Sequence, residues 1–158
     1  MNEKFFDLKK EKQDRMINAS LKVFAMNGYA HASTDDIVRE AGISKGLLFH
    51  YFVSKLGLYS FIYDYSIRYV ILELTTGVDK EETDYFRLVG QIREAELQVM
   101  RNYPCMMLFL NNSRLENVSE VLLETEDKRN ILSEKYAQIL SQATGEELDE
   151  RLSREQLS

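Results

Sequence analysis

Residues Asp36–Tyr59 read DIVREAGISKGLLFHYFVSKLGLY, and this stretch decides the fold that we predict. Its pattern indicates two short helices around a tight turn, followed by the beginning of a third helix. Gly42 can adopt positive φ without a Cβ penalty, so it can end the first helix and redirect the chain. Ser44 is a preferred N-cap for the second helix. Two short helices joined by a glycine-containing turn are typical of the helix-turn-helix, whose second helix enters the DNA major groove.

Apolar residues recur at helical spacing on both sides of this turn. They are Ile37, Val38 and Ala41 before it, and Ile43, Leu47 or Leu48, and Phe52 after it. Among the polar residues, Lys45 lies in the first turn of the second helix, where its charge is unfavourable for the helix dipole. We therefore expect Lys45 to serve a partner outside the helix, such as a phosphate group.

The string AGISKGLLFHYFVSKLGLY, residues 41–59, closely resembles the helix-turn-helix signature of TetR-type transcriptional regulators. Those proteins typically show Ala-Gly-Val-Ser-Lys-Gly, then an aromatic-rich Tyr-Phe, then Ser-Lys and an apolar residue. The match runs from Ser33 to Tyr59, and the helical layout extends it across the preceding helix. A bare helix-turn-helix would be a weak signal, but agreement over the whole string is a strong one.

The resemblance implies specific DNA contacts. Lys45, Gly46 and Leu47 lie where family members approach base edges: glycine lets the backbone come close, and leucine offers an apolar contact, for example to a thymine methyl. His50 and Tyr51 match positions that contact base or phosphate. The family commonly places phosphate contacts on the hydroxyl residue that starts the preceding helix, here Thr34, and on a lysine, here Lys55. The full set of expected DNA-binding residues is Thr34, Ser44, Lys45, Gly46, Leu47, His50, Tyr51 and Lys55.

Several positions also allow a plainer interpretation. Ser33 with Asp36 three residues later resembles a capping box, so the hydroxyls at this helix start can be plain N-caps. His50 can be a surface histidine without a role. Phe49 stands where the family usually has tyrosine, and it lacks the hydroxyl for a phosphate contact. The KKEK run at residues 9–12 can reach phosphate as a basic arm, or form a solvated face with its acidic neighbours.

The composition is that of a globular protein with long uninterrupted elements. The chain has 158 residues, of which 44% are apolar, with one proline and seven glycines. This length suits one domain, or two small domains that share a core. No apolar run approaches the roughly 18 residues of a membrane span, and the N-terminus lacks the apolar region of a signal peptide. Cys105 is the one cysteine, so an internal disulfide is excluded and a reducing cytoplasm is the simplest location.

The net charge of −6 argues against a simple nucleic-acid binder, but its distribution weakens that objection. Residues 1–55 carry nine Lys and Arg against seven Asp and Glu, a balance of +2, whereas the remainder has a balance of −8. Phosphate attraction falls off over a Debye length of about 8–10 Å, so the acidic part need not touch DNA. Ordinary solvating charge explains the acidic part equally well.

Hydrophobic periodicity beyond the motif predicts an all-α protein. We expect helices at Leu8–Asn27 with Gly28 as the stop, from Ser33, at Ser44–Phe52, at Lys55–Thr76 closed by Gly77, at Asp84–Tyr103, from Pro104, and at Ser119–Ala143 ended by Gly145. The fourth of these is apolar most of the way round, so several neighbours must cover it, and it would connect two domains mechanically. The charged tail after Gly145 carries only a thin stripe of Leu148, Leu152 and Leu157.

The resemblance also implies an effector pocket and a homodimer, formed by the region after Thr76. We expect a mostly apolar molecule, aromatic or cationic, to bind among the fourth to seventh helices. The expected ligand-binding residues are Phe61, Tyr65, Tyr69, Glu96, Met100, Met107 and Phe109. Glu96 interrupts an apolar stripe; it can bind the ligand, pair with an arginine of another helix, or lie at the edge of the stripe. The methionines of the sixth helix can be an adaptable pocket wall or core filler.

These observations predict two domains. Residues 1–54 would form a helix-turn-helix DNA-binding domain, and residues 55–158 a helical effector-binding and dimerisation domain. Family members usually continue with two further long helices that pair across the dimer, and this chain ends before any such apolar pair. We therefore interpret the sequence as a truncation or as the ordered part of a longer protein; if it is intact, the usual route of dimerisation is not expected.

The leading prediction is a ligand-responsive transcriptional regulator, a repressor. It would bind a near-palindromic operator in double-stranded DNA as a homodimer and be released by a small hydrophobic effector. The alternative is a helical interaction protein that keeps the motif but lacks operator binding, which the acidic remainder and the leucine-striped tail favour. No nucleophile motif, glycine-rich phosphate loop or His/Cys metal cluster occurs, so we predict no enzyme activity, no metal and no cofactor. We also predict no membrane partner.

Overall fold

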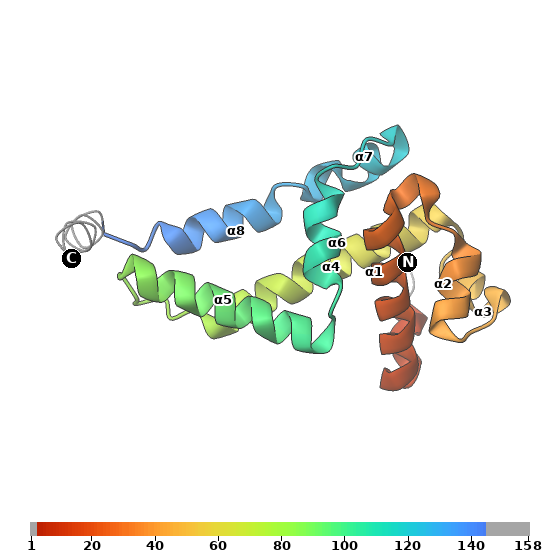
Figure 1. Cartoon of the computed structure of the whole chain (residues 1–158), viewed down its shortest axis with the longest axis horizontal. Coiled ribbons are helices and arrows are strands. Elements are labelled where there is room, and N and C mark those ends of the chain that lie inside the picture. Colours follow the sequence, from red (N-terminus) through yellow and green to blue (C-terminus); the bar gives the residue numbers. More distant parts are fainter. Residues whose placement is uncertain (1–2, 145–158) are drawn as a thin grey trace.

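The computed structural model describes residues 3–144, which form helices joined by short connections (Figure 1). A 3-10 turn, η1 (Glu3–Asp7), precedes α1 (Lys10–His31), α2 (Thr34–Ala41), α3 (Lys45–Tyr51), α4 (Lys55–Gly77), α5 (Tyr85–Asn102), α6 (Met106–Ser113), α7 (Ser119–Thr125), η2 (Glu126–Lys128) and α8 (Ile131–Leu140). Residues 3–144 contain no strand, so the predicted all-α fold is confirmed. The predicted helix end at Gly145 and the stripe of Leu148, Leu152 and Leu157 lie outside the described residues.

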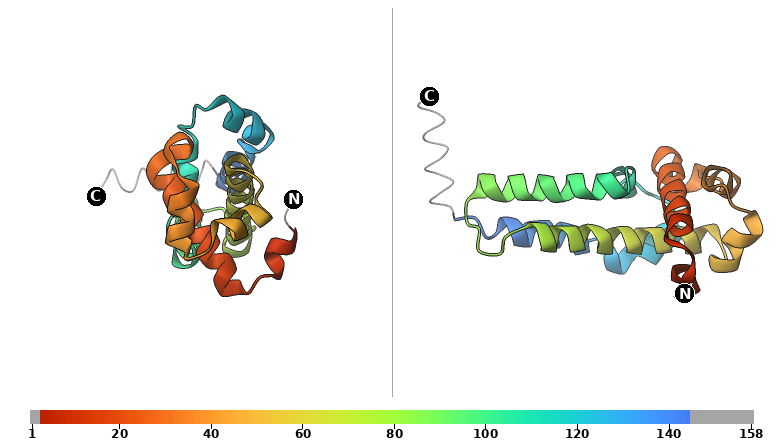
Figure 2. Two further views of the ribbon diagram at one scale, coloured as in Figure 1. Left: turned by 90° about the vertical axis from the view of Figure 1, so that its right-hand side faces the viewer. Right: turned by 90° about the horizontal axis from the view of Figure 1, so that it is seen from below.

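Helix α4 runs along the length of the molecule, and most other helices pack on it (Figure 1). Figure 2 shows that α1 crosses α4 near the end that carries α2 and α3, whereas α5 and α8 lie alongside its other half. Leu58, Ile62, Val70 and Leu74 are all buried, although they do not lie on one stripe of the helix. A helix that is apolar most of the way round is stable here because α1, α5, α6, α7 and α8 cover its different sides.

Side-chain caps define several helix starts. Ser33, Ser44, Ser54 and Asp84 each accept a hydrogen bond from a backbone N–H in the first turn of the helix that follows. Such a cap satisfies a donor that has no partner within the helix and is worth about 1 kcal/mol. The predicted starts at Ser33 and Ser44 are therefore confirmed as N-cap positions. In a capping box, the Asp36 side chain would accept a hydrogen bond from the backbone N–H of Ser33. In the structure, the Asp36 carboxylate pairs with Arg39 at 3.0 Å.

Two helix boundaries differ from the prediction. Helix α1 continues past Gly28 to His31, although Gly28 itself has non-helical geometry, with φ +73° and ψ 170°. The chain makes one further turn because the Ala32 N–H donates to the Gly28 carbonyl at 3.0 Å. Pro104 lies before α6 rather than in its first turn, because the chain first forms a tight turn in which the Met106 N–H donates to the carbonyl of the residue before Pro104.

The predicted seventh helix, Ser119–Ala143, is wrong as one continuous element. The structure divides it into α7, η2 and α8. The backbone departs from ideal helical geometry at Thr125, with φ −104° and ψ 0°, and again at Asn130, with φ −100° and ψ −5°. The Thr125 hydroxyl donates to the Val121 carbonyl at 2.8 Å, a local side-chain bond that competes with the backbone pattern of a helix. Val121 of α7 and Ile139 of α8 are both buried, and α7 and α8 each pack on α4.

Buried side chains form one continuous cluster through the molecule. It extends from Phe5 of η1, through α1 and α4, to Ile139 of α8. The helix-turn-helix region and the later helices therefore share a core and do not have separate interiors. Within residues 3–144, no helix combines the length and the apolar character that crossing a bilayer requires.

Candidate nucleic-acid interface

Helices α2 and α3 are joined by a turn that depends on Gly42. This residue has φ +67° and ψ 38°, a left-handed conformation that disfavours any residue with a Cβ. The Ile43 N–H donates to the Val38 carbonyl at 3.1 Å, which closes the end of α2. Ile37 of α2 and Leu48 of α3 are buried, and they hold both helices to the core. The other sides of α2 and α3 are consequently left facing solvent.

The outer side of α3 carries most of the residues expected to bind DNA. Ser44, Lys45, Gly46 and His50 are exposed, and Leu47 is half-buried. A Cβ added to Gly46 would meet no atom within 4 Å, so the backbone there is open to close approach by another molecule. Helix α3 therefore presents an accessible surface of the kind that fits a major groove.

Lys45 already has a partner in α2. Its ammonium nitrogen lies 2.9 Å from a carboxylate oxygen of Asp35. The hydrogen bond from Lys45, together with its charge, lowers the pKa of Asp35 below its usual value. Both side chains are exposed, so water and salt weaken the pair. A phosphate oxygen can replace a carboxylate as the partner of an ammonium group, and contact between Lys45 and DNA stays a prediction.

The starts of α2 and α3 lie in one region of the surface, because the pair of Lys45 and Asp35 joins them. Thr34, the first residue of α2, is half-buried beside Asp35. The Ser44 hydroxyl oxygen accepts from the Leu47 N–H at 3.1 Å, which leaves its hydrogen available to an acceptor such as phosphate. The structure thus brings Thr34, Ser44 and Lys45 together.

Tyr51 lies at the end of α3 and is half-buried. Its ring packs edge-on against Phe5 of η1, with centroids 5.9 Å apart, and against His50 at 4.9 Å. Phe5 is fully buried and packs in turn on Phe61 of α4, so η1 supports the end of α3. This role of η1 was missed in the sequence, where the adjacent pair Phe5-Phe6 within a charged segment was the available signal.

Lys55, the second lysine expected at phosphate, donates to the end of α1. Its ammonium nitrogen lies 2.8 Å from the Tyr29 carbonyl oxygen, 3.2 Å from that of Ala32, and 4.4 Å from the centre of the Tyr29 ring. A cation at the C-terminal end of a helix is favourable for the helix dipole. An ammonium group has three donors, so one N–H remains for a phosphate oxygen. Contact between Lys55 and DNA stays a prediction.

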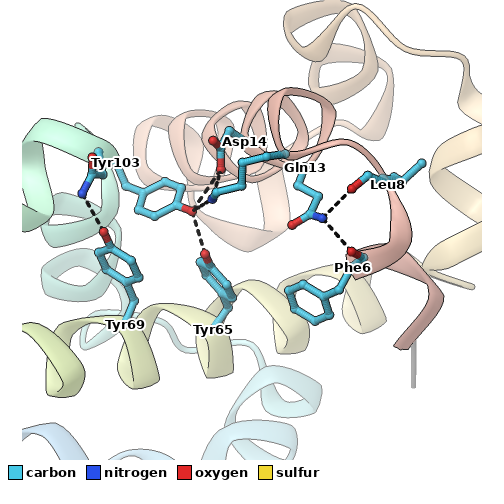
Figure 3. Close-up of polar contacts among 9 residues, drawn as sticks. Phe6, Leu8, Gln13, Asp14, Tyr65, Tyr69 and Tyr103 are labelled. Carbon is cyan, nitrogen blue, oxygen red and sulfur yellow. Dashed lines mark hydrogen bonds and ion pairs between the residues drawn. The ribbon is translucent and has the colours of Figure 1, made fainter.

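Three of the residues expected to bind an effector form an aromatic row on α4. Phe61 stacks on Tyr65, and Tyr65 on Tyr69, each at a centroid separation of 6.1 Å. Tyr65 and Tyr69 both meet the ring of Tyr103 edge-on, at 5.7 and 4.9 Å. The Tyr69 hydroxyl also accepts a 2.7 Å hydrogen bond from Asn102 (Figure 3). The row therefore faces the end of α5.

The other four expected effector residues lie on α5 and α6. Glu96 accepts a 2.8 Å hydrogen bond from the Tyr136 hydroxyl of α8, so it pairs with a tyrosine. Burial, followed by this hydrogen bond, raises the pKa of Tyr136. Met100 is exposed, Met107 is half-buried and Phe109 is buried. Among residues 3–144, no hydrogen bond, ion pair or ring contact joins these four to the aromatic row. Their joint role in one pocket stays a prediction.

Tyr103, which follows α5, connects that helix to α1 (Figure 3). Its hydroxyl donates to the Asp14 carboxylate at 3.1 Å and accepts from the Lys10 ammonium at 3.3 Å. The Tyr65 hydroxyl lies 2.6 Å away and is the donor to Tyr103, because the single hydrogen of Tyr103 serves Asp14. Burial raises the pKa of Tyr103 to about 12. In the sequence, Tyr103 had been identified only as the last residue of the predicted helix Asp84–Tyr103.

A hollow of about 620 Å³ opens beside Asp14, between α1, α2 and the turn before α6. Its lining residues are Glu11, Asp14, Arg15, Asn18, Ala19, Lys22, Glu40, Pro104 and Cys105. The volume is within the range of small-molecule sites, but much of this lining is charged, and Lys22 is paired with Glu40 at 2.8 Å. None of the residues expected to bind an effector lines this hollow.

Comparison with known proteins identifies the helix-turn-helix region. Residues 16–60 match the family of bacterial regulatory proteins, tetR family. Over 93 residues the chain is 38% identical to the uncharacterized HTH-type transcriptional regulator YuxN of Bacillus subtilis (strain 168). This match covers 56% of the present chain and 32% of YuxN. Over 47 residues the chain is 40% identical to the uncharacterized HTH-type transcriptional regulator TtgW of Pseudomonas putida. This match covers 30% of the present chain and 35% of TtgW. The matches thus span about a third of these relatives.

A solved structure shows the same arrangement of helices. A chain from Shewanella sp. PV-4, assigned to the tetR family of transcription regulators, aligns with a TM-score of 0.59 at 23% identity, covering 85% of this chain and 70% of its own. This likeness concerns the fold, whereas the family match concerns α1 to the beginning of α4. The resemblance of residues 41–59 to the TetR-type signature is confirmed, because the part of the chain that contains them, residues 16–60, matches the tetR family of bacterial regulatory proteins.

Proposed function

We propose that the chain binds double-stranded DNA and regulates transcription, with α3 as the helix that enters the major groove. The observation that carries this proposal is the outer side of α3, where Lys45, Gly46 and His50 face solvent while Leu48 anchors the helix in the core. Lysine and histidine can donate to phosphate or base edges, and glycine admits close approach of the backbone. The tetR family match of the surrounding residues supports the same conclusion.

We propose further that the protein is a repressor that acts in the cytoplasm and binds the half-sites of a near-palindromic operator as a homodimer. A small, mostly apolar effector would release it. The row of Phe61, Tyr65 and Tyr69 is the part of the expected pocket with the best support, because it lies next to the junction of Tyr103 with α1. Such an effector acts only through a difference in affinity between conformations that do and do not match the operator.

A titration of DNA affinity against salt concentration tests whether α3 contacts the DNA. The probe is a duplex that the wild-type chain selects from random-sequence DNA. Lys45→Ala should weaken binding to all duplexes and reduce the slope of log affinity against log salt by about one, if the partner of Lys45 is a phosphate. The matched control is Lys80→Ala, an exposed lysine between α4 and α5, which should leave the slope unchanged. An unchanged slope for Lys45→Ala, measured by fluorescence anisotropy, rejects this role.

The alternative, a helical interaction protein without operator binding, is favoured by exposed leucines near α7. Leu115 and Leu123 are 81% and 73% exposed, and together they offer apolar surface that a partner protein can cover. Gel filtration with light scattering, combined with the DNA selection, separates the two functions. A monomer that enriches no duplex favours the interaction protein, whereas a dimer that enriches a near-palindrome favours the regulator.

A further inference from the structure

Tyr29 lies directly after the kink at Gly28, at the point where α1 departs from helical geometry. It is 5% exposed, and its ring stacks on Phe24 at 6.3 Å and meets Tyr59 edge-on at 5.4 Å. Because of the kink, the backbone N–H of Tyr29 donates to the side chain of Glu116, which lies before α7, and not to a carbonyl of α1. Tyr29 is therefore a fixed, buried residue whose backbone can bind other elements.

Two carboxylates near the start of α7 hold Tyr29. Its backbone N–H donates to Glu116 at 3.1 Å, and its hydroxyl donates to Glu120 at 3.0 Å. Hydrogen bonds to ionised acceptors are roughly twice as strong as those between neutral groups. We call residues 116–120 the acidic segment. It fastens both the backbone and the side chain of Tyr29.

Lys55 fastens the same residue to the beginning of α4. Its ammonium donates to the Tyr29 carbonyl at 2.8 Å and lies 4.4 Å from the centre of the ring. It also donates to the carbonyl of Ala32, which directly precedes Ser33, the N-cap of α2. Lys55 thus ties the end of α1 to the start of α2, where Thr34 is expected to meet DNA.

We propose that Tyr29 is a positioning residue: the acidic segment holds Tyr29, and Tyr29 in turn fixes Lys55 and the start of α2 in the arrangement that binds the operator. This inference rests on the proposed DNA-binding function and specifies how the later helices act on it. A displacement of the acidic segment relative to α4 would reach Lys55 and Thr34 through hydrogen bonds, without rearranging α3.

Helix α7 also makes a polar contact with α4, and this contact supplies a matched control. The Glu124 carboxylate accepts from the Ser60 hydroxyl at 3.1 Å. Glu124 has the same charge as Glu120 and lies on the same helix, but this contact does not involve Tyr29 or Lys55. If α7 contributed only to the general packing of the helices, its contacts with α1 and with α4 would matter equally for DNA binding. The proposed role depends on Glu116 and Glu120.

The first test compares affinities for two DNA probes, a duplex selected by the wild-type chain from random-sequence DNA and a scrambled duplex of equal length. Tyr29→Phe removes only the hydroxyl that Glu120 accepts from. We expect it to bind the selected duplex about 3- to 10-fold more weakly, because fewer molecules hold the competent arrangement. Binding to the scrambled duplex depends mainly on charge and should change by less than about twofold. Thermal unfolding verifies that each variant is folded.

The double variant Glu116→Gln/Glu120→Gln should show the same selective loss, although removal of two negative charges by itself favours DNA binding. Glu124→Gln removes a charge from the same helix and should show no such loss. A loss in Glu124→Gln equal to that in the double variant would overturn the proposal, as would wild-type affinity for the selected duplex in both Tyr29→Phe and the double variant.

Acetylation of lysine amines, followed by mass spectrometry, tests the positioning of Lys55 without DNA. Lys55 should react several-fold faster in the double variant than in the wild-type chain, with exposed Lys45 as the internal reference. If the wild-type chain selects no duplex, the proposed DNA-binding function fails, and the acetylation rate alone decides the positioning role. Faster acetylation of Lys55 in the double variant then supports the proposal that Tyr29 holds Lys55 in place, and an unchanged rate overturns it.

Discussion

The two ends of α1 are attached to the rest of the molecule by different kinds of contact. At the N-terminal end the contacts join side chains: the Tyr103 hydroxyl bridges Asp14, Lys10 and Tyr65 (Figure 3). At the C-terminal end Tyr29 contributes its backbone N–H and carbonyl as well as its hydroxyl. One attachment thus depends on side-chain rotamers, and the other depends on the path of the backbone.

This difference indicates which end of α1 can move. The ion pair of Lys10 and Asp14 is solvent-accessible, with side chains 69% and 36% exposed, so its members can change rotamer. Tyr29 is buried and follows a backbone kink that only glycine adopts readily. We therefore expect rotamer changes to loosen α1 mainly at its N-terminal end, whereas its C-terminal end moves only together with the residues that hold Tyr29.

Among these variants, a change in the backbone kink at the C-terminal end of α1 should lower the free energy of unfolding most. Gly28 has φ +73° and ψ 170°, so Gly28→Ala should lower the free energy of unfolding by about 1–3 kcal/mol. No atom lies within 4 Å of an added Cβ, so the loss would come from backbone strain and not from a clash. Gly90→Ala in α5, which has equally open surroundings, should be neutral or stabilise by up to about 1 kcal/mol. Equal urea midpoints for the two variants would contradict this account.

Breaking the N-terminal attachment should have a smaller effect. Tyr103→Phe removes the hydroxyl shared by Asp14, Lys10 and Tyr65, and should lower the free energy of unfolding by about 1–2 kcal/mol. The control is Tyr85→Phe, a half-buried tyrosine at the start of α5. Affinity for the selected duplex should fall less in Tyr103→Phe than in Tyr29→Phe. A larger loss of affinity in Tyr103→Phe than in Tyr29→Phe would show that the N-terminal end of α1 has the greater influence on DNA binding.

Alkaline titration sharpens the comparison, because a tyrosine hydroxyl serves each attachment. Burial raises the pKa of both Tyr29 and Tyr103 from 10.0 to about 12, and for Tyr29 the hydrogen bond to Glu120 adds to this. Each folded-state pKa lies above the unfolded one, so the stabilisation is complete below pH 10 and is lost as the pH rises through 12. One tyrosine changes the free energy of unfolding by at most about 1.4 kcal/mol per pH unit.

Between pH 10 and 12, the stability of Tyr29→Phe and Tyr103→Phe should therefore fall less steeply than that of the wild-type chain. Circular dichroism at a series of urea concentrations measures this slope. A slope identical to the wild-type slope in either variant would show that the replaced tyrosine does not hold its proton more tightly in the folded protein.

The smallest effect is expected at the exposed ion pair. Lys10→Met keeps most of the apolar stem but removes the charge that lies 2.7 Å from Asp14. An exposed pair is worth about 0–1 kcal/mol, and removing a cation from the first turn of α1 relieves an unfavourable dipole interaction. We expect a change below about 1 kcal/mol that disappears in high salt. A larger, salt-independent loss would mean that Lys10 acts mainly through its hydrogen bond to Tyr103.

Local sequence signals located the helix-turn-helix well. The left-handed turn at Gly42 and the N-caps at Ser33 and Ser44 follow from backbone preferences and from hydrogen bonds that span two or three residues. The break after α7 was not predictable in the same way, because the apolar residues on its two sides lie within one stripe of a straight helix.

The candidate site could be predicted only in part. The exposure of Gly46 and His50 follows from the burial of Leu48, because each lies two residues from it and about 160° away around the helix, so the amphipathic pattern was sufficient for these two. Lys45 lies only about 60° from Leu48, and its exposure did not follow from that pattern. The partners of Lys55 were not predictable, because they are the carbonyls of Tyr29 and Ala32, more than twenty residues earlier in the chain. No local pattern encodes such a contact.

The sequence by itself determined the helix-turn-helix: where α2 ends, where α3 begins, and that Leu48 of α3 faces the core. These features depend on φ and ψ preferences and on neighbours within one or two helical turns. Only the tertiary structure decided how α1 is attached at its two ends, through Tyr103 and through Tyr29. Those attachments join residues about 90 positions apart, as in the contacts of Tyr103 with Asp14 and of Tyr29 with Glu120, so they exist only once α4 has brought the other helices together.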